Sequence, residues 1–311
     1  MKGMMNTMNE NEQKFPKPGP VAAVVVMLFE LGVSFYLLSA AQYYLGMWGM
    51  VITELAFVAI SLGAAWVVGL SVKEMLPFKR IRVNEFFGTI VLWAGSLLLV
   101  LIINLIFFYF FPEGLEVNVN ITSFINSWPA IPALFVVAVM PAVCEEMLHR
   151  GFIQRCFMKK IKSKMLTCII MGIFFGLFHM DFYRFIGTAI LGGILSYVLI
   201  TTDNFFYNML FHFINNFFAQ MLSIIAGSMT ETIDTAEALT RDTIPMALAS
   251  YLIIGCVAPF LLLGGSMLLK GLKRIKAEGT TKLVVSIVIA GVLAIVMFVT
   301  GVAMMASYII K

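Results

Sequence analysis

A short stretch of this sequence, PAVCEEMLHRGF, carries two adjacent carboxylates followed by an imidazole and a guanidinium. Residues four apart share one face of a helix, so Glu146 lies over Arg150 and Glu145 lies over His149. An ion pair between Glu146 and Arg150 would account for one acid and one base. It leaves Glu145 without a strong partner, and a carboxylate in an apolar helix is costly unless something compensates it. The stretch therefore favours a functional role for Glu145.

Two further histidines and an amide could complete a hydrolytic site. Glu145 lies 17 residues before Lys162, the centre of a basic turn, and His179 lies 17 residues after it. An antiparallel hairpin would place both at one depth, on the order of 20 Å from that turn. His212 and Asn216 share a face of a later helix. A lone histidine on an apolar helix is usually a core residue, but these groups together could supply a base, its partner and oxyanion donors.

The composition places these residues in a membrane protein. Only 12% of the 311 residues are charged, 61% are hydrophobic, and the mean hydropathy is +0.96. A soluble domain carries about 25% charged residues. This shortage excludes a soluble enzyme, a disordered tail and a nucleic-acid-binding domain. A charged residue at the centre of a membrane span costs roughly 2.5–3.5 kcal/mol, so the few that remain there are candidates for function.

The elements that must position the site are apolar helices. Long apolar runs fall near 21–44, 49–72, 87–111, 130–157, 165–180, 185–201, 204–227, 246–269 and 283–310. They predict an all-α polytopic integral membrane protein, a bundle of about eight to nine transmembrane helices. We divide it into a polar cytoplasmic tail (1–20), N-terminal helices (21–129), a catalytic core (130–227) and C-terminal helices (228–311).

The connectors predict the orientation of the chain in the membrane. Residues 73–86 and 270–282 are basic, whereas 112–129 and 228–245 are polar with mostly acidic charges. With the N-terminus inside and nine crossings, all but three of the 21 basic residues lie on the cytoplasmic side. The exceptions are Arg184, Arg241 and Lys311. Because Lys and Arg are enriched in cytoplasmic loops, we expect a cytoplasmic N-terminus.

Three motifs in this order resemble the signature of the CAAX protease and bacteriocin-processing family, also called the CPBP or Abi family, which includes the type II CAAX prenyl endopeptidases. They are EExxxR at Glu145–Arg150, FxxxH ending at His179 and HxxxN from His212 to Asn216. The surrounding runs IFFGLFHMD, LGGILSYVL and LFHFINN fit as well. The resemblance covers about residues 130–220 and implies an intramembrane endopeptidase.

The resemblance also implies roles for individual residues. Glu145 would be the general base that activates water, assisted by His179. Glu146 and Arg150 would support that site, and His212 with Asn216 would stabilise the oxyanion. His149 stands where the family has an aromatic residue, and we expect it to fill space rather than to bond Glu145.

The resemblance favours a mechanism without metal or other cofactor, although two histidines and a glutamate could hold zinc. We expect a peptide or lipidated protein substrate, with either a CAAX-type C-terminus or a bacterial leader, bacteriocin or pheromone sequence. Membrane lipid is the other expected partner, and a bacterial cell membrane the expected location. The alternative is a non-catalytic bacteriocin-immunity or transport-assisting protein on the same scaffold. The intact motifs argue against it, because such a protein could lose Glu145 or His179 without penalty.

Other features in apolar segments have structural explanations. Glu30 and Glu54 lie in the first two spans, where the hairpin could bring them together as a protonated or hydrogen-bonded pair. Gly192 and Gly193 are expected to let two helices approach closely.

Overall fold

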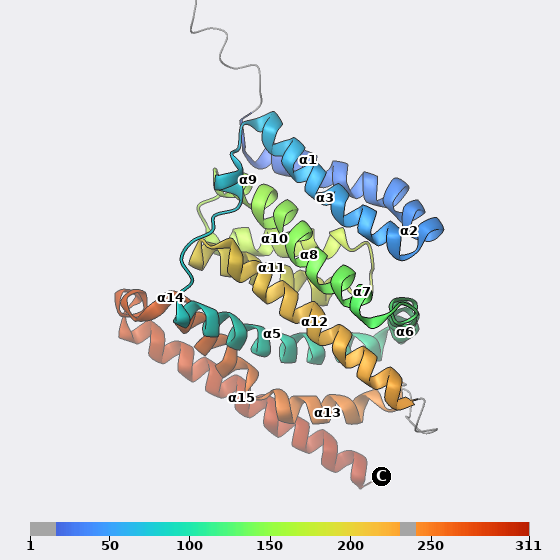
Figure 1. Cartoon of the computed structure of the whole chain (residues 1–311). Coiled ribbons are helices and arrows are strands. Elements are labelled where there is room, and N and C mark those ends of the chain that lie inside the picture. Colours follow the sequence, from blue (N-terminus) through green and yellow to red (C-terminus); the bar gives the residue numbers. More distant parts are fainter. Residues whose placement is uncertain (1–16, 231–240, 311) are drawn as a thin grey trace, which may run out of the picture.

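The computed structural model describes residues 17–230 and 241–310, which form helices and no strand. Figure 1 shows the longer helices lying side by side, with their ends gathered at two opposite ends of the bundle. The all-α polytopic architecture is thereby confirmed. Most of the predicted polar tail at 1–20, and part of the predicted 228–245 connector, lie outside the described residues.

The helices follow the predicted apolar runs. The first half of the chain contains α1 (Pro20–Val33), η1 (Ser34–Leu38), α2 (Ser39–Leu45), α3 (Met47–Val68), α4 (Val72–Met75), α5 (Val83–Phe110), α6 (Glu113–Asn126), α7 (Ala130–Leu134) and η2 (Phe135–Val139). The second half contains α8 (Met140–Glu146), η3 (Met147–Ile153), α9 (Gln154–Met158), α10 (Lys164–Phe178), α11 (Phe185–Thr202), α12 (Phe205–Thr230), α13 (Ile244–Gly255), α14 (Ala258–Glu278) and α15 (Thr280–Ile309). The elements η1 to η3 are short π-helical turns inside longer helices.

Fewer helices than the predicted eight to nine could cross a membrane unaided. Within the described residues, six are long and apolar enough, or seven if α13 and α14, bent by 43° at their junction, form one span. The helix α10 is short, at 15 residues. The helix α12 is long but carries several amide side chains and a histidine, which lower its hydropathy. The helix α12 packs among other helices that satisfy these groups, and α10 packs along α11.

Local chemistry explains the interruptions and the unpredicted helices. Pro259 stands in the first turn of α14, just after the α13–α14 junction, where its missing N–H is tolerated. The basic segment 270–282, expected as a connector, is mostly helical, with a break at Gly271 (φ +72°). The 112–129 connector likewise contains α6, with Glu113 and Glu116 in its first turn, where they complement the helix dipole.

Small residues allow the close approach of helices around the site. A Cβ added at Gly192 on α11 would lie 2.5 Å from the Cβ of Phe175 on α10. At Gly193 it would lie 3.2 Å from the backbone oxygen of Cys168. The predicted role of these glycines in close packing of α10 and α11 is therefore confirmed.

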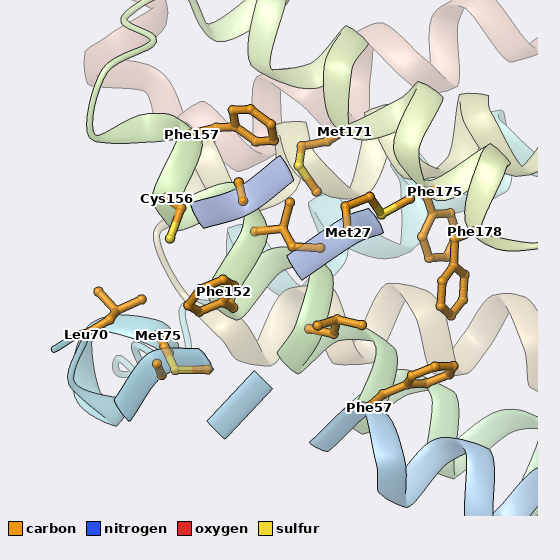
Figure 2. Packing of buried hydrophobic residues seen from close by; sticks show 14 of the residues in the cluster. Met27, Phe57, Leu70, Met75, Phe152, Cys156, Phe157, Met171, Phe175 and Phe178 are labelled. Carbon is orange, nitrogen blue, oxygen red and sulfur yellow. The ribbon is translucent and has the colours of Figure 1, made fainter. Parts of the chain in front are cut away.

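One side of the site rests on a large apolar cluster, shown in Figure 2. Met27 of α1, Phe57 of α3 and Phe152 of η3 all belong to it. The Phe57 and Phe178 rings lie 4.9 Å apart between centroids, and Phe178 leads directly to His179. The cluster thus joins the N-terminal helices firmly to the helices that carry the predicted site residues.

Candidate active site

The helix that carries Glu145 is interrupted on both sides of it by π-helical turns, η2 and η3. Such turns are frequent at functional sites. Pro141 stands four residues after Val137 and has no N–H to donate to that carbonyl. The side-chain amide of Asn216 on α12 donates to the Val137 oxygen instead, at 3.0 Å. The break in the helix therefore anchors Asn216 beside the Glu145 helix.

Glu146 is the centre of a fully buried polar network. Its Oε1 accepts from Arg150 Nη1 at 3.0 Å and contacts His212 Nδ1 at 2.9 Å. Its Oε2 accepts a longer bond from Asn208 Nδ2, at 3.4 Å. A carboxylate paired with Arg150 has only acceptors, so His212 Nδ1 carries a proton. The predicted Glu146–Arg150 pair therefore exists, and it also fixes the orientation of His212.

Arg150 is held on three sides although no part of it reaches the surface. Its Nη2 donates to the backbone oxygen of Gly192 at 3.1 Å, and its guanidinium carbon lies 4.4 Å from the centre of the Phe175 ring. The close approach of α10 and α11 at Gly192 brings both contacts within reach. A charge so deeply buried depends on these partners, and above all on Glu146.

Glu145 turns toward a cavity rather than into this network. Its Oε2 lies 3.9 Å from His212 Nε2, too far for a hydrogen bond, and has no hydrogen-bond partner within the described residues. The cavity has a volume of about 370 Å³. Its lining includes four of the six predicted site residues, Glu145, His179, His212 and Asn216. Glu146 and Arg150 do not line it and lie behind His212.

His179 is placed by the end of α10. Its Nδ1 lies 2.8 Å from the backbone oxygen of Phe175, one of the carbonyls that a helix end leaves free. A carbonyl only accepts, so Nδ1 carries the proton and Nε2 of a neutral ring keeps its lone pair. Met180, with φ +48°, then ends the helix in the left-handed conformation. Among the described residues, no hydrogen bond joins His179 to Glu145, although both line the cavity.

His149 packs as a space-filling residue and also contacts the backbone of Glu145. Its Nδ1 lies 2.9 Å from the backbone oxygen of Glu145 and makes no bond to the carboxylate. The ring packs edge-on against Phe175 and Phe178, at 5.1 and 4.5 Å between centroids. It is fully buried and does not line the cavity. His149 therefore fills an aromatic position and supports the backbone at Glu145.

Three residues at the site were missed by sequence reasoning or given no place in it. Asn208 lies one helical turn before His212, a spacing that could have revealed its contact with Glu146. Glu54 lines the cavity and has a buried, unpartnered Oε2, whereas Glu30 bonds Ser34 at 2.7 Å. Within the described residues no hydrogen bond joins Glu30 to Glu54. Arg184 also lines the cavity and was noted only as a topological exception.

The donor set does not form a metal site of ordinary geometry. Within the ranges 17–230 and 241–310, no three His, Cys, Asp or Glu side chains are grouped so that they could hold an ion. The expectation of chemistry without a metal stays a prediction.

A comparison with known families finds a match to the central segment of the chain. Residues 126–218 match a family model described as Type II CAAX prenyl endopeptidase Rce1-like. The match covers less than a third of the chain but includes all six predicted site residues, and it confirms the resemblance seen in the motifs. No curated protein and no solved structure matches the chain.

Proposed function

We propose that this chain, whose residues 126–218 match the Rce1-like family, is an intramembrane endopeptidase of the glutamate type. The observation that carries the proposal is the convergence of Glu145, His179, His212 and Asn216 on one cavity. They come from three helical segments separated in sequence, and each brings a group that peptide hydrolysis requires. Residues with only a structural role would have no need to converge on a cavity.

Glu145 is the general base. A water between its carboxylate and the substrate carbonyl gives a proton to Glu145 while the oxygen forms a bond to the carbonyl carbon. The carbonyl electrons move to oxygen and produce a tetrahedral oxyanion. Collapse of that intermediate breaks the carbon–nitrogen bond, and the proton held by Glu145 passes to the leaving amine. The free Oε2 of Glu145 supports this role, because it is not committed to another partner.

His179 assists Glu145 in handling the water. With its Nδ1 proton directed at the Phe175 oxygen, a neutral ring presents Nε2 as an acceptor. An acceptor beside the general base can hold the second proton of the attacking water and orient its lone pair. Among the described residues, no hydrogen bond joins His179 directly to Glu145, so both side chains can hydrogen-bond the same water from different sides.

His212 and Asn216 stabilise the oxyanion. Their other hydrogen bonds determine which protons each side chain can donate to it. Glu146 already holds the Nδ1 proton of His212, so donation from Nε2 requires both ring nitrogens to be protonated. Asn216 uses one amide hydrogen on the Val137 oxygen and keeps a second for the oxyanion. Donors fixed in this way stabilise developing charge without reorganising at the moment of reaction.

Glu146 and Arg150 are positioning residues. They do not line the cavity, and they act by holding His212 through the 2.9 Å contact between Glu146 and Nδ1. The substrate is a peptide or a lipidated protein, with a CAAX-type C-terminus or a leader, bacteriocin or pheromone sequence. The chain resides in a membrane, we propose a bacterial one, with its N-terminus in the cytoplasm.

The test is hydrolysis of candidate peptides by the purified chain in detergent, with both products identified by mass spectrometry. We expect wild-type protein to cleave and His179→Ala to lose cleavage while still inserting into membranes. Lys162→Ala, in the exposed turn far from the cavity, is the matched control and should cleave normally. Full activity in His179→Ala would contradict its role. Wild-type protein that cleaves no peptide, together with an immunity phenotype that survives His179→Ala, would favour the non-catalytic alternative.

A further inference from the structure

We propose that the cavity opens on the non-cytoplasmic side of the membrane and that the substrate is an exported peptide or the non-cytoplasmic part of a membrane-bound chain. This inference rests on the proposed endopeptidase function and narrows its substrate class. The motifs leave two substrate classes open, a CAAX-type C-terminus and a bacterial leader, bacteriocin or pheromone peptide. The inference favours the second class, because a prenylated CAAX protein presents its C-terminus in the cytoplasm.

The two ends of the bundle differ strongly in charge. One end, at the left of Figure 1, gathers the α9–α10 turn, the start of α5 and the α14–α15 junction. Described basic residues at this end are Lys17, Lys73, Lys79, Arg80, Arg82, Arg155, Lys159, Lys160, Lys162, Lys164, Lys270, Lys276 and Lys282. The opposite end, with α2, α6 and α7, has Arg184 and Arg241 among its described residues. The excess of Lys and Arg assigns the first end to the cytoplasm.

The mouth of the cavity lies at the end of the bundle that has few basic residues. Ser39 and Gln42 on α2 and Met180 after α10 line the cavity and are exposed. Arg184 and Ile121 of α6 join them at that end of the bundle. Ser39, Gln42 and Ile121 belong to α2 and α6 at this end, whereas Met180 follows His179 and lies deeper, at the depth of Glu145. The exposed part of the lining therefore extends from the depth of Glu145 to the end that faces away from the cytoplasm.

The cytoplasmic end of the cavity is closed. The deep lining residues Phe175, Leu195 and Phe211 are buried, each at most 3% exposed. Beyond them lies the Glu146–Arg150 network, and Gln154, one turn further on, is fully buried with its amide on the Ser196 oxygen. A peptide arriving from the cytoplasm would have to displace this packing, whereas one arriving at the mouth meets an existing opening.

Aromatic residues place the mouth near the lipid headgroups. Tyr43, Tyr44 and Trp48 flank the α2–α3 turn and are 83%, 80% and 65% exposed. Trp and Tyr collect at membrane–water interfaces. Gln42 immediately precedes this group, so the mouth lies at the level of the non-cytoplasmic interface. Glu145 follows Ala130 by 15 residues, about 22 Å along the helix, which places the reacting group near the middle of the bilayer.

The side of the opening is tested by thiol labelling that does not depend on activity. Gln42→Cys places a thiol at the mouth, and Lys162→Cys places one in the basic turn as the matched control. In sealed right-side-out vesicles, a membrane-impermeant maleimide should label Gln42→Cys above the wild-type background and leave Lys162→Cys unlabelled. Inverted vesicles should give the reverse. Labelling of Gln42→Cys from the cytoplasmic face would overturn the proposal.

The substrate side is tested with a membrane-impermeant peptide that the chain cleaves in detergent. Right-side-out vesicles should cleave it, and sealed inverted vesicles should lose cleavage until detergent is added. Cleavage by sealed inverted vesicles alone would overturn the proposed substrate class. A chain that cleaves no peptide in detergent would refute the endopeptidase function, while the labelling result would still decide where the cavity opens. If a cysteine variant does not accumulate, an epitope inserted after Lys162 reports the same orientation by antibody access.

Discussion

The substitution Glu146→Gln tests how strongly the buried network depends on its carboxylate. In the wild-type protein Glu146 faces Arg150 at 3.0 Å and His212 at 2.9 Å, and neither Glu146 nor Arg150 has any exposed surface. Glutamine keeps the shape and one acceptor oxygen but removes the charge. The retained oxygen can still accept from Arg150 Nη1 or His212 Nδ1, but Arg150 then remains buried with no carboxylate to balance its charge.

Removing one partner of a buried ion pair costs about 3–5 kcal/mol, since the remaining charge is left uncompensated. We expect Glu146→Gln to lower the free energy of unfolding by that amount. The pair Glu74–Lys159, 3.5 Å apart, supplies the matched control because both side chains are about half exposed. Glu74→Gln keeps a residue able to complete the Ser71 capping box, so it should cost less than about 1 kcal/mol.

The assay is unfolding in mixed micelles with increasing SDS, followed by circular dichroism. A third variant, Glu146→Gln with Arg150→Met, removes both charges and should be more stable than Glu146→Gln alone, because no uncompensated charge remains. The reasoning is refuted if Glu146→Gln is no less stable than Glu74→Gln, or if the double variant is less stable than the single one.

Three other predictions concern His149, Asp203 and the role of metal. His149→Phe should retain cleavage and lose about 1 kcal/mol of stability, the value of its hydrogen bond to the Glu145 backbone; loss of cleavage in a folded protein would show that the imidazole is needed. Burial raises the pKa of Asp203, but hydrogen bonds from Lys79 and Arg155 outweigh it and hold that pKa below its ordinary 3.8. The stabilisation by ionised Asp203 is therefore present above its unfolded pKa and is lost as pH falls below it, so the stability difference between wild type and Asp203→Asn should shrink below about pH 4. Chelators should leave cleavage unchanged; loss on chelation with recovery on adding zinc would contradict the metal-free mechanism.

Local periodicity was enough to predict part of the site. Glu146 and Arg150 are four apart on one helix, and this spacing led directly to their ion pair. The glycines at 192 and 193 were likewise understood from their size alone. The all-α fold followed from apolar runs, since a membrane leaves few alternatives for backbone hydrogen bonding.

Contacts between distant segments were beyond this reasoning. His212 was expected to face the reaction with Asn216, but its Nδ1 is committed to Glu146, 66 residues away in sequence. The Gly192 oxygen that receives Arg150 is a backbone atom, which no side-chain pattern reveals. Glu54 reaches the cavity only because α3 packs beside the Glu145 helix. Such contacts depend on helix rotation and register, which hydropathy does not specify.

The eight to nine predicted spans include more helices than the six or seven that are long and apolar enough to cross a membrane by themselves within the described residues. The apolar runs that predict spans include the 15-residue α10 and the amide-rich α12. Neighbouring helices supply partners for the polar side chains of α12, so it does not need the uniform apolarity of a helix surrounded by lipid, whereas α10 is simply short.

The central claim, that Glu145 activates water, is tested most directly by the kcat of Glu145→Gln in lipid nanodiscs. Glu30→Gln is the matched control, because Glu30 is also buried in an apolar helix but bonds Ser34 and does not line the cavity. We predict that Glu145→Gln folds and lowers kcat by about 10²–10⁴-fold, the usual contribution of a general base, and that Glu30→Gln retains wild-type turnover. Wild-type turnover in Glu145→Gln would contradict the mechanism.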